Sequence, residues 1–167
     1  MDLIILGAGG FGRTVAEAAK AQYQTVRFLD DHSREPDGMG KCEEYLAYQN
    51  DGTEFYPAFG NNETRLRWRD LLARNGCAIA TIVHPRAWSA VPVGEGSVVL
   101  PGALINQVCT DGRGCIVTLG AIVDHGCILE DGVHVCLGAI VKAENRIPRG
   151  MKVEAGEVIP NRTYPLT

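Results

Sequence analysis

The chain has 167 residues, of which 46% are hydrophobic and 22% charged, and its formal net charge is −4 at pH 7. This is the composition of an ordinary globular protein, with enough length for two small domains or for one with a substantial core. The negative charge argues against a nucleic-acid partner, because such partners require a basic surface. No apolar stretch approaches the length of a membrane span, and Asp2 interrupts the only run that resembles a signal peptide.

The chain opens with the pattern of a strand, a glycine turn and a helix. An apolar run at residues 3–6 leads into Gly7, Gly9 and Gly12, spaced G-x-G-x-x-G, and an alanine-rich helical pattern follows at residues 14–21. In this context glycines let the backbone approach a phosphate, and the first amides of the helix point at it. The alternative is that the glycines only permit a tight turn.

The pattern continues as a small α/β domain with three or four parallel strands. A second strand at residues 25–29 ends at Asp30 and Asp31, and an acid at this place commonly binds a ribose hydroxyl. About eighty residues are too few for a complete dinucleotide fold, so a nicotinamide cofactor is a minor alternative. The other expected elements are a mostly irregular stretch at 32–52 with a short helix at 43–48, a strand at 55–59, a turn at 60–62, a helix at 63–75 with Leu66, Leu71 and Leu72 on its apolar side and Gly76 as its stop, and a strand at 78–83.

An aliphatic residue recurs at every sixth position in the second half. Eleven of the twelve positions from Val93 to Ile159 are branched aliphatics, and Asp111 is the exception. Four places further on in each hexad, every position from Ser97 to Ala139 is small or slim. Period six fits neither a helix nor an alternating strand, and predicts a solenoid whose coils bury their aliphatic residues against one another. A purely structural solenoid is the alternative to an enzyme.

Two stretches interrupt this rule. Asp111 occupies an inward position within the segment 110–114, where two glycines and a charge predict a turn that breaks the coil. Near the end, Asn145, Met151 and Glu157 fill positions reserved for small residues. We expect an imperfect last coil or a cap there.

The six cysteines predict thiols rather than a metal site. There is no C-x-x-C pair and no spacing typical of zinc ligands. Cys109, Cys115 and Cys127 occupy the small position of the repeat, where a buried thiol behaves as a small apolar side chain. Cys109 and Cys127 lie eighteen residues apart and are expected to stack in adjacent coils. A reducing cytoplasm is the expected compartment.

Two histidines are candidates for chemistry. His125 lies two places after the inward Val123, on the turn of its hexad, so it is expected to project outward near a corner. Acyl transfer needs a base of near-neutral pKa close to the nucleophile, together with donors for the oxyanion. His134, nine residues further on, is expected to face the same groove. The alternative is that both are solvated surface side chains.

Six short motifs follow one another along the chain: Gly-Ala-Gly-Gly-Phe-Gly-Arg at 7–13, Phe-Leu-Asp-Asp at 28–31, Gly-Asn-Asn-Glu at 60–63 followed by Arg65, Ile-Val-His-Pro at 82–85, Gly-Ala-Ile-Val-Asp-His at 120–125, and Gly-Val-His-Val at 132–135. Their order resembles the bacterial sugar O-/N-acetyltransferases of the sialic-acid and UDP-bacillosamine type, in the hexapeptide-repeat acyltransferase superfamily. The resemblance covers nearly the whole chain. It implies a Rossmann-like domain at residues 1–84 followed by a left-handed parallel β-helix at residues 85–167.

The resemblance also implies the roles of particular residues in a homotrimer with active sites between protomers. Acetyl-CoA is the expected donor, and no metal is expected. His125 would be the general base, with Asp124 beside it. The implied CoA contacts are His134, Gly138 and Ala143. The implied nucleotide-sugar contacts are Gly9, Gly10, Phe11, Asp30, Asp31, Gly60 and Asn61.

We therefore predict an acetyl-CoA-dependent acetyltransferase that acts on a UDP-4-amino-sugar in surface-glycan synthesis. Enzymes of the bacillosamine type commonly carry an acid directly after the base, whereas Gly126 follows His125 here. The repeat also ends earlier than is usual in that family. These departures motivate an alternative of another class, a non-catalytic nucleotide-sugar-binding or regulatory protein on the same scaffold.

Overall fold

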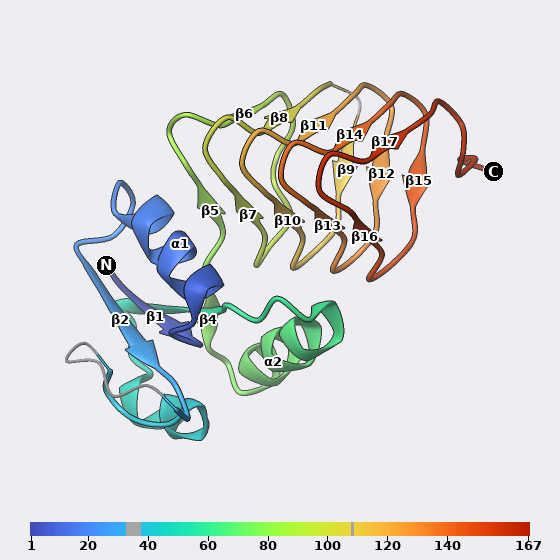
Figure 1. Ribbon diagram of the computed structural model, residues 1–167. Coiled ribbons are helices and arrows are strands. Elements are labelled where there is room, and N and C mark those ends of the chain that lie inside the picture. The colour runs from blue at the N-terminus through green and yellow to red at the C-terminus, as the bar shows by residue number, and fades with distance from the viewer. Residues whose placement is uncertain (33–37, 108) are drawn as a thin grey trace. The chain divides into compact units, whose positions relative to one another are not determined.

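The computed structural model describes residues 1–32, 38–107 and 109–167 (Figure 1). The chain forms two compact units, Met1–Ala80 and Thr81–Thr167. The division falls before the predicted one after residue 84, because Ile82–Val83 already pairs with Val98–Val99 as part of the solenoid. The predicted strand at 78–83 is therefore two short strands, which belong to different sheets.

The first unit is a parallel sheet with the strand order β2-β1-β3-β4, which confirms the predicted α/β class. All four side chains from Leu3 to Leu6 are buried, as expected for a central parallel strand that is covered on both faces. Ile4 and Leu6 pack in one cluster with Leu72. The elements are β1 (Asp2–Leu6), α1 (Gly10–Ala19), β2 (Thr25–Leu29), the 3-10 helix η1 (Cys42–Tyr48), β3 (Thr53–Pro57), α2 (Asn62–Arg74) and β4 (Ala78–Ile79).

Helix α2 has clear signals at both ends. The Asn61 side chain accepts a hydrogen bond from the backbone N–H three residues further on, at 2.9 Å, and so caps the helix. Gly76, with φ of +73°, ends it as predicted. Leu66 and Leu72 are buried, but Leu71 is 40% exposed because it lies on the outer flank of the helix.

The second unit is a three-sided prism of stacked coils, which confirms the predicted β-helix class (Figure 1). Strands pair in parallel with strands eighteen residues away, so three hexads make one coil. The first sheet holds β5 (Ile82–Val83), β7 (Val98–Val99), β10 (Ile116–Val117), β13 (His134–Val135) and β16 (Lys152–Val153). The second holds β6 (Trp88–Ser89), β8 (Leu104–Ile105), β11 (Ile122–Val123), β14 (Ile140–Val141) and β17 (Val158–Ile159), and the third holds β9 (Thr110–Asp111), β12 (Ile128–Leu129) and β15 (Arg146–Ile147).

The interior of the prism follows the six-residue rule. The aliphatic position is buried from Val99 to Ile159 wherever its burial is described, and nearly all of the small positions are fully buried as well. Each strand points one aliphatic side chain into the core of the prism. The core is narrow, so the other inward position of each hexad, at the corner, has room only for a small side chain.

Both expected interruptions are absorbed into the coil. Thr110–Asp111 forms strand β9, paired with Ile128–Leu129, so the predicted break is wrong. A Cβ on Gly112 would lie 2.6 Å from the backbone nitrogen of Asp131, so this glycine lets two coils approach closely. The regular β15, β16 and β17 show that the last coil is not imperfect either.

Asn145 explains how the last coil tolerates a polar residue at a small position. The side chain is fully buried. Its Nδ2 donates to the carbonyls of Lys142 and Pro160, each at 2.8 Å, and its Oδ1 accepts from the backbone N–H of Tyr164 at 2.9 Å. These bonds satisfy the buried amide and join the end of the chain to the coil above.

Candidate functional site

The glycine turn of the first unit is shaped by close packing. Gly7 has φ of +102°, and a Cβ there would lie 3.2 Å from the carbonyl oxygen of Ala58. A Cβ on Gly12 would lie 2.0 Å from the carbonyl oxygen of Gly7, so any side chain at residue 12 would push helix α1 away from the turn. Two of the three fingerprint glycines are thus required for packing.

Gly9 and Gly10 have a different character. Both are exposed, and a Cβ on either would meet no heavy atom within 4 Å. Gly9 is the N-cap of α1, and no side chain of the described residues caps that end. The first amides of the helix, including that of Phe11, therefore face open space and can receive an anionic group such as a phosphate.

Asp30 is held against the turn. Its Oδ2 accepts the backbone N–H of Ala8 at 2.6 Å, and its Oδ1 accepts that of His32 at 2.7 Å. Asp31 is exposed, and its Oδ1 accepts the backbone N–H of Cys42 at 3.0 Å. Asp30 thus contacts the glycine turn, whereas Asp31 contacts the start of η1.

The loop after β3 lies at the same edge of the sheet. Strand β1 pairs in parallel with β2 on one side and β3 on the other, so the carboxyl ends of all three strands meet where ligands bind in open α/β sheets. Gly60 is exposed with open space around it, and the side chain of Asn61 caps α2. The fully buried Arg65 donates through Nη1 to the carbonyl of Phe59 at 3.0 Å and so fixes this loop.

Cys42 is a residue of this edge that the sequence did not single out. Its Sγ donates to the carbonyl of Leu29 at 3.3 Å. Burial, together with the negative charges of Asp31 and Asp30, raises the pKa of Cys42 to about 12. The thiol therefore stays protonated and serves packing, not nucleophilic chemistry.

His125 lies where the chain turns from the second sheet to the third; we call the stacked turns 106–107, 124–126, 142–144 and 160–162 the histidine corner. Its imidazole is exposed. Asp124 uses its Oδ1 to accept the backbone N–H of His125 at 2.7 Å and the Nδ2 of Asn106 at 3.2 Å. In the described part of the chain, Asp124 therefore fixes the backbone of the turn and makes no hydrogen bond to the ring.

The charge of Asp124 is favoured by its surroundings. The hydrogen bond from the His125 backbone lowers its pKa, burial opposes this, and the Asn106 amide and the charges of His125 and Lys142 lower the pKa further. A permanent carboxylate thus lies at the base of the turn that carries the imidazole.

Glu144 and Arg162 belong to the same corner and were missed in the sequence. They follow Gly126 at intervals of eighteen, one and two coils further on, and form an ion pair. A signal for them exists in the sequence: glycine recurs at every sixth position from Gly96, with φ between +61° and +74°, and Val108, Glu144 and Arg162 are the residues that break that series.

Cys109 and Cys127 stack in adjacent coils just after this corner. The hydrogen bond from the Cys127 thiol lowers the pKa of Cys109 to about 7, against the effect of burial, and the same contact raises the pKa of Cys127. The stacking was predicted, but Cys109 is partly exposed and more acidic than an inert core thiol.

The residues expected to contact CoA are spread over the prism. His134 lies on β13 in the first sheet, in register with Ile116 and Lys152. In a three-sided prism the corner between the second and third sheets is opposite the first sheet, so within one chain His125 and His134 lie on different sides of the prism, and a groove that holds both would need a neighbouring protomer. Gly138 lies at the corner between the first and second sheets, whereas Ala143 lies one coil below His125.

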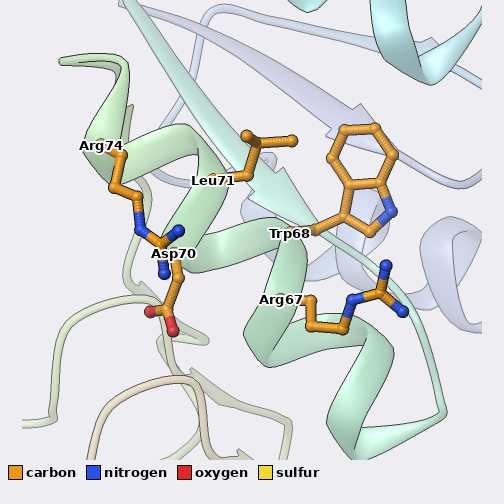
Figure 2. A pocket seen from close by; sticks show the side chains of 5 residues that line it. All are labelled: Arg67, Trp68, Asp70, Leu71 and Arg74. Atoms are coloured by element: carbon orange, nitrogen blue, oxygen red, sulfur yellow. The ribbon is translucent and has the colours of Figure 1, made fainter.

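A cavity of about 340 Å³ lies on the flank of α2 in the first unit (Figure 2). Trp68 forms part of its wall and stacks on Phe59, with the ring centroids 5.9 Å apart. The cavity holds none of the predicted site residues. Its lining consists of Arg67, Trp68, Asp70, Leu71 and Arg74.

Across the described ranges, no group of three or more His, Cys, Asp or Glu side chains is arranged to hold a metal ion. Within the same ranges, none of the helices combines the length and apolarity needed to span a membrane.

Comparisons with known proteins agree with this geometry. The model of the PglD N-terminal domain family matches residues 2–72. The acetyltransferase domain of PglB from Neisseria gonorrhoeae FA1090 superimposes with a TM-score of 0.90 at 28% identity, over 96% of this chain and 83% of that chain. The same domain in complex with acetyl coenzyme A gives 0.81 at 26% identity, over 96% and 82%. No curated protein matches.

A third match concerns the fold alone. A mutant GDP-perosamine N-acetyltransferase from Caulobacter crescentus, in complex with CoA and GDP-perosamine, gives a TM-score of 0.79 at 23% identity, over 96% of this chain and 89% of that chain. Taken together, fold and matches support a bacterial sugar acetyltransferase of the hexapeptide-repeat type. The resemblance predicted from the six motifs is thereby confirmed.

Proposed function

We propose that the chain transfers the acetyl group of acetyl-CoA to a nucleotide-linked amino sugar of the UDP-4-amino-sugar type, with His125 as general base. The superposition on the PglB acetyltransferase domain carries this proposal, because it extends over 96% of the chain and that domain also has a structure with acetyl coenzyme A. Synthesis of a surface glycan is the setting we propose. The six free cysteines suit a reducing cytoplasm.

The nucleotide-sugar is assigned to the carboxyl edge of the first unit. The uncapped amides at Gly9, Gly10 and Phe11 suit a diphosphate. The exposed Asp31 suits a hydroxyl of the ribose, while Asp30 keeps the turn in shape. Gly60 and Asn61 would border the same pocket from the loop after β3.

At the histidine corner, the exposed imidazole of His125 would take a proton from the neutral sugar amine as its nitrogen attacks the thioester carbonyl. A C–N bond forms, the C–S bond breaks, and the proton passes to the leaving CoA thiolate. Asp124 holds the turn through the His125 backbone. General base catalysis of this kind requires the ring to reach the nucleophile directly or through one water.

A homotrimer is supported by an apolar stripe on the second sheet. Its outward side chains are Trp88, Leu104, Ile122, Ile140 and Val158. Trp88, Leu104 and Val158 are 53%, 40% and 51% exposed in the single chain. A continuous apolar strip of this kind marks a protein interface. A neighbour covering it would stand beside the histidine corner and could bring its own His134 and Gly138 there, with Ala143 already below His125.

The test is to mix the protein with acetyl-CoA and a UDP-4-amino-sugar and to look by mass spectrometry for the gain of one acetyl group. His125→Ala is expected to lower kcat by about 10²- to 10⁴-fold with the fold intact. His84→Ala is the matched control, since His84 lies in the solenoid outside the corner and its Nδ1 accepts the backbone N–H of Arg86. Unchanged turnover in His125→Ala would remove the base assignment. Calorimetric binding of the nucleotide-sugar without any binding of acetyl-CoA would favour a non-catalytic binding protein instead.

A further inference from the structure

The turns of the solenoid share a left-handed backbone conformation with positive φ, which glycine adopts at a lower free energy than any other residue. Nine glycines from Gly96 to Gly156 adopt positive φ there. Among the described residues, Glu144 (φ of 59°) and Arg162 (φ of 57°) are the non-glycine residues with positive φ. A side chain in the left-handed region costs free energy relative to glycine, and residues held there cluster at functional sites.

Both exceptions lie in the histidine corner, in consecutive coils beneath Gly126. The backbone N–H of Glu144 donates to the carbonyl of His125 at 3.2 Å. A Cβ on Gly126 would lie 3.6 Å from Cγ of Glu144, so the Glu144 side chain extends into the space that the glycine leaves open beside the imidazole. Arg162 pairs with the Glu144 carboxylate from the other side.

An ion pair between coils does not by itself require this strained backbone. At the corner between the third and first sheets, Arg113 pairs with Asp131 across adjacent coils at 2.7 Å, and glycine still occupies the left-handed positions at Gly114 and Gly132. The charged pair there stands one place earlier in the turn. The placement of Glu144 in the left-handed position therefore needs another reason, and the adjacent imidazole supplies one.

The charged groups around His125 support an interaction between Glu144 and the imidazole. Asp124 faces it from its own turn and Glu144 from the next coil, with Lys142 beside Asp124 and Arg162 beyond Glu144. Arg162 holds the pKa of Glu144 below its usual value, and the positive charge of His125 lowers that pKa further. Glu144 is thus the carboxylate that the neighbouring coil presents to the imidazole.

We propose that Glu144 is a positioning residue for His125: its carboxylate, held by Arg162, orients the imidazole and stabilises the imidazolium formed when the ring takes the proton of the acceptor amine. The proposal rests on the acetyl transfer proposed above. The proton moves from amine nitrogen to imidazole and then to the CoA sulfur, and Glu144 gains and loses no proton.

Glu144→Gly and Glu144→Gln test it kinetically. Glycine is the favoured residue at this φ, so Glu144→Gly is expected to melt no lower than the wild type. Its kcat should fall roughly tenfold, with KM nearly unchanged, and the acidic limb of the kcat/KM–pH profile should move to lower pH. Glu144→Gln should move the limb in the same way. Asp131→Asn, the matched control at the other corner, should leave both kcat and the limb unchanged.

Rescue separates positioning from packing. In the double variant Gly126→Glu with Glu144→Gly, the carboxylate returns to the same space from the residue above, so kcat and the acidic limb should recover most of the loss. A loss of kcat without movement of the limb, or a limb that stays shifted in the double variant, would overturn the proposal.

The contact can also be measured without substrate. The titration of the Glu144 side-chain carboxyl carbon, followed by NMR, should move to higher pH in His125→Ala, because the attraction of the imidazolium is lost. An unchanged Glu144 titration overturns the proposal. If the wild type proves inactive, acetyl transfer fails as the function, and this titration alone decides whether Glu144 and His125 interact.

Discussion

Two corners of the same prism have the same backbone but different chemistry. The corner between the third and first sheets, which we call the ion-pair corner, carries Arg113 and Asp131 as a pair with side chains 57% and 28% exposed. Its left-handed positions are glycine throughout. The histidine corner instead places Glu144 and Arg162 in those positions. The repeat thus builds both corners with the same backbone. Charged residues replace glycine at the histidine corner, which also carries the candidate base His125.

The difference teaches which irregularities of a repeat carry information about function. At the ion-pair corner, the charged residues fit the coil and satisfy each other, which is sufficient to explain them. Glu130, the residue before Asp131, is also paired with the next coil: its carboxylate accepts hydrogen bonds from the Nε of Arg146 and the backbone N–H of Arg149. Within the described ranges, charged residues occupy backbone positions that disfavour them only at the histidine corner.

The largest effect is expected from Gly112→Ala at the ion-pair corner. The added Cβ would lie 2.6 Å from the backbone of the next coil, which cannot yield without separating the coils, so the free energy of unfolding should fall by roughly 3 kcal/mol. Urea denaturation measures it. Gly156→Ala is the control: its φ is +69° but the space is open, and its cost should be about 1 kcal/mol. Equal costs for the two variants would show that close approach of the coils is not the reason for Gly112.

An intermediate effect is expected from Gly150→Glu, which gives the ion-pair corner the residue type that Glu144 gives the histidine corner. Gly150 has φ of +68°, so the substitution should lower the free energy of unfolding by about 1 kcal/mol. Acetyl transfer should not change, because the candidate base His125 lies at another corner of the prism. The opposite substitution, Glu144→Gly, should keep or raise stability while lowering activity. A destabilised Glu144→Gly would break the comparison between the corners.

The smallest effect is expected from Asp131→Asn, because an exposed pair contributes about 0.5 kcal/mol. Burial would raise the pKa of Asp131, but the hydrogen bonds from Arg113 outweigh it and hold the pKa below its usual value. A depressed folded-state pKa contributes stability above the unfolded pKa of about 4 and loses it as pH falls through the folded value. Wild type and variant should therefore differ at pH 7 and converge as the pH falls through the lowered pKa of Asp131, as thermal melts across the acidic range can check. A difference that persists at low pH would show that the pair is not electrostatic.

Most of the architecture could be predicted from the sequence because it is set by local patterns. The six-residue recurrence of aliphatics specifies the solenoid, since each strand buries only one of them. Strand, glycine turn and helix at the start, and the acids after the second strand, specify the edge where Gly9, Gly10 and Asp30 meet. Boundaries such as that between Ala80 and Thr81 could not be predicted, because adjacent short strands join different ladders only when partners distant in the sequence are known.

The sequence by itself therefore determined the two-part architecture and the exposure of His125 at a corner, because periodicity decides which side chains point inward. Only the tertiary structure decided what surrounds that histidine. Stacking in steps of eighteen brings Glu144 beneath Gly126, turns Asp124 to the backbone, and places His134 on another face of the prism. Contacts between coils depend on which turns lie above one another, and no local pattern in a single hexad contains that information.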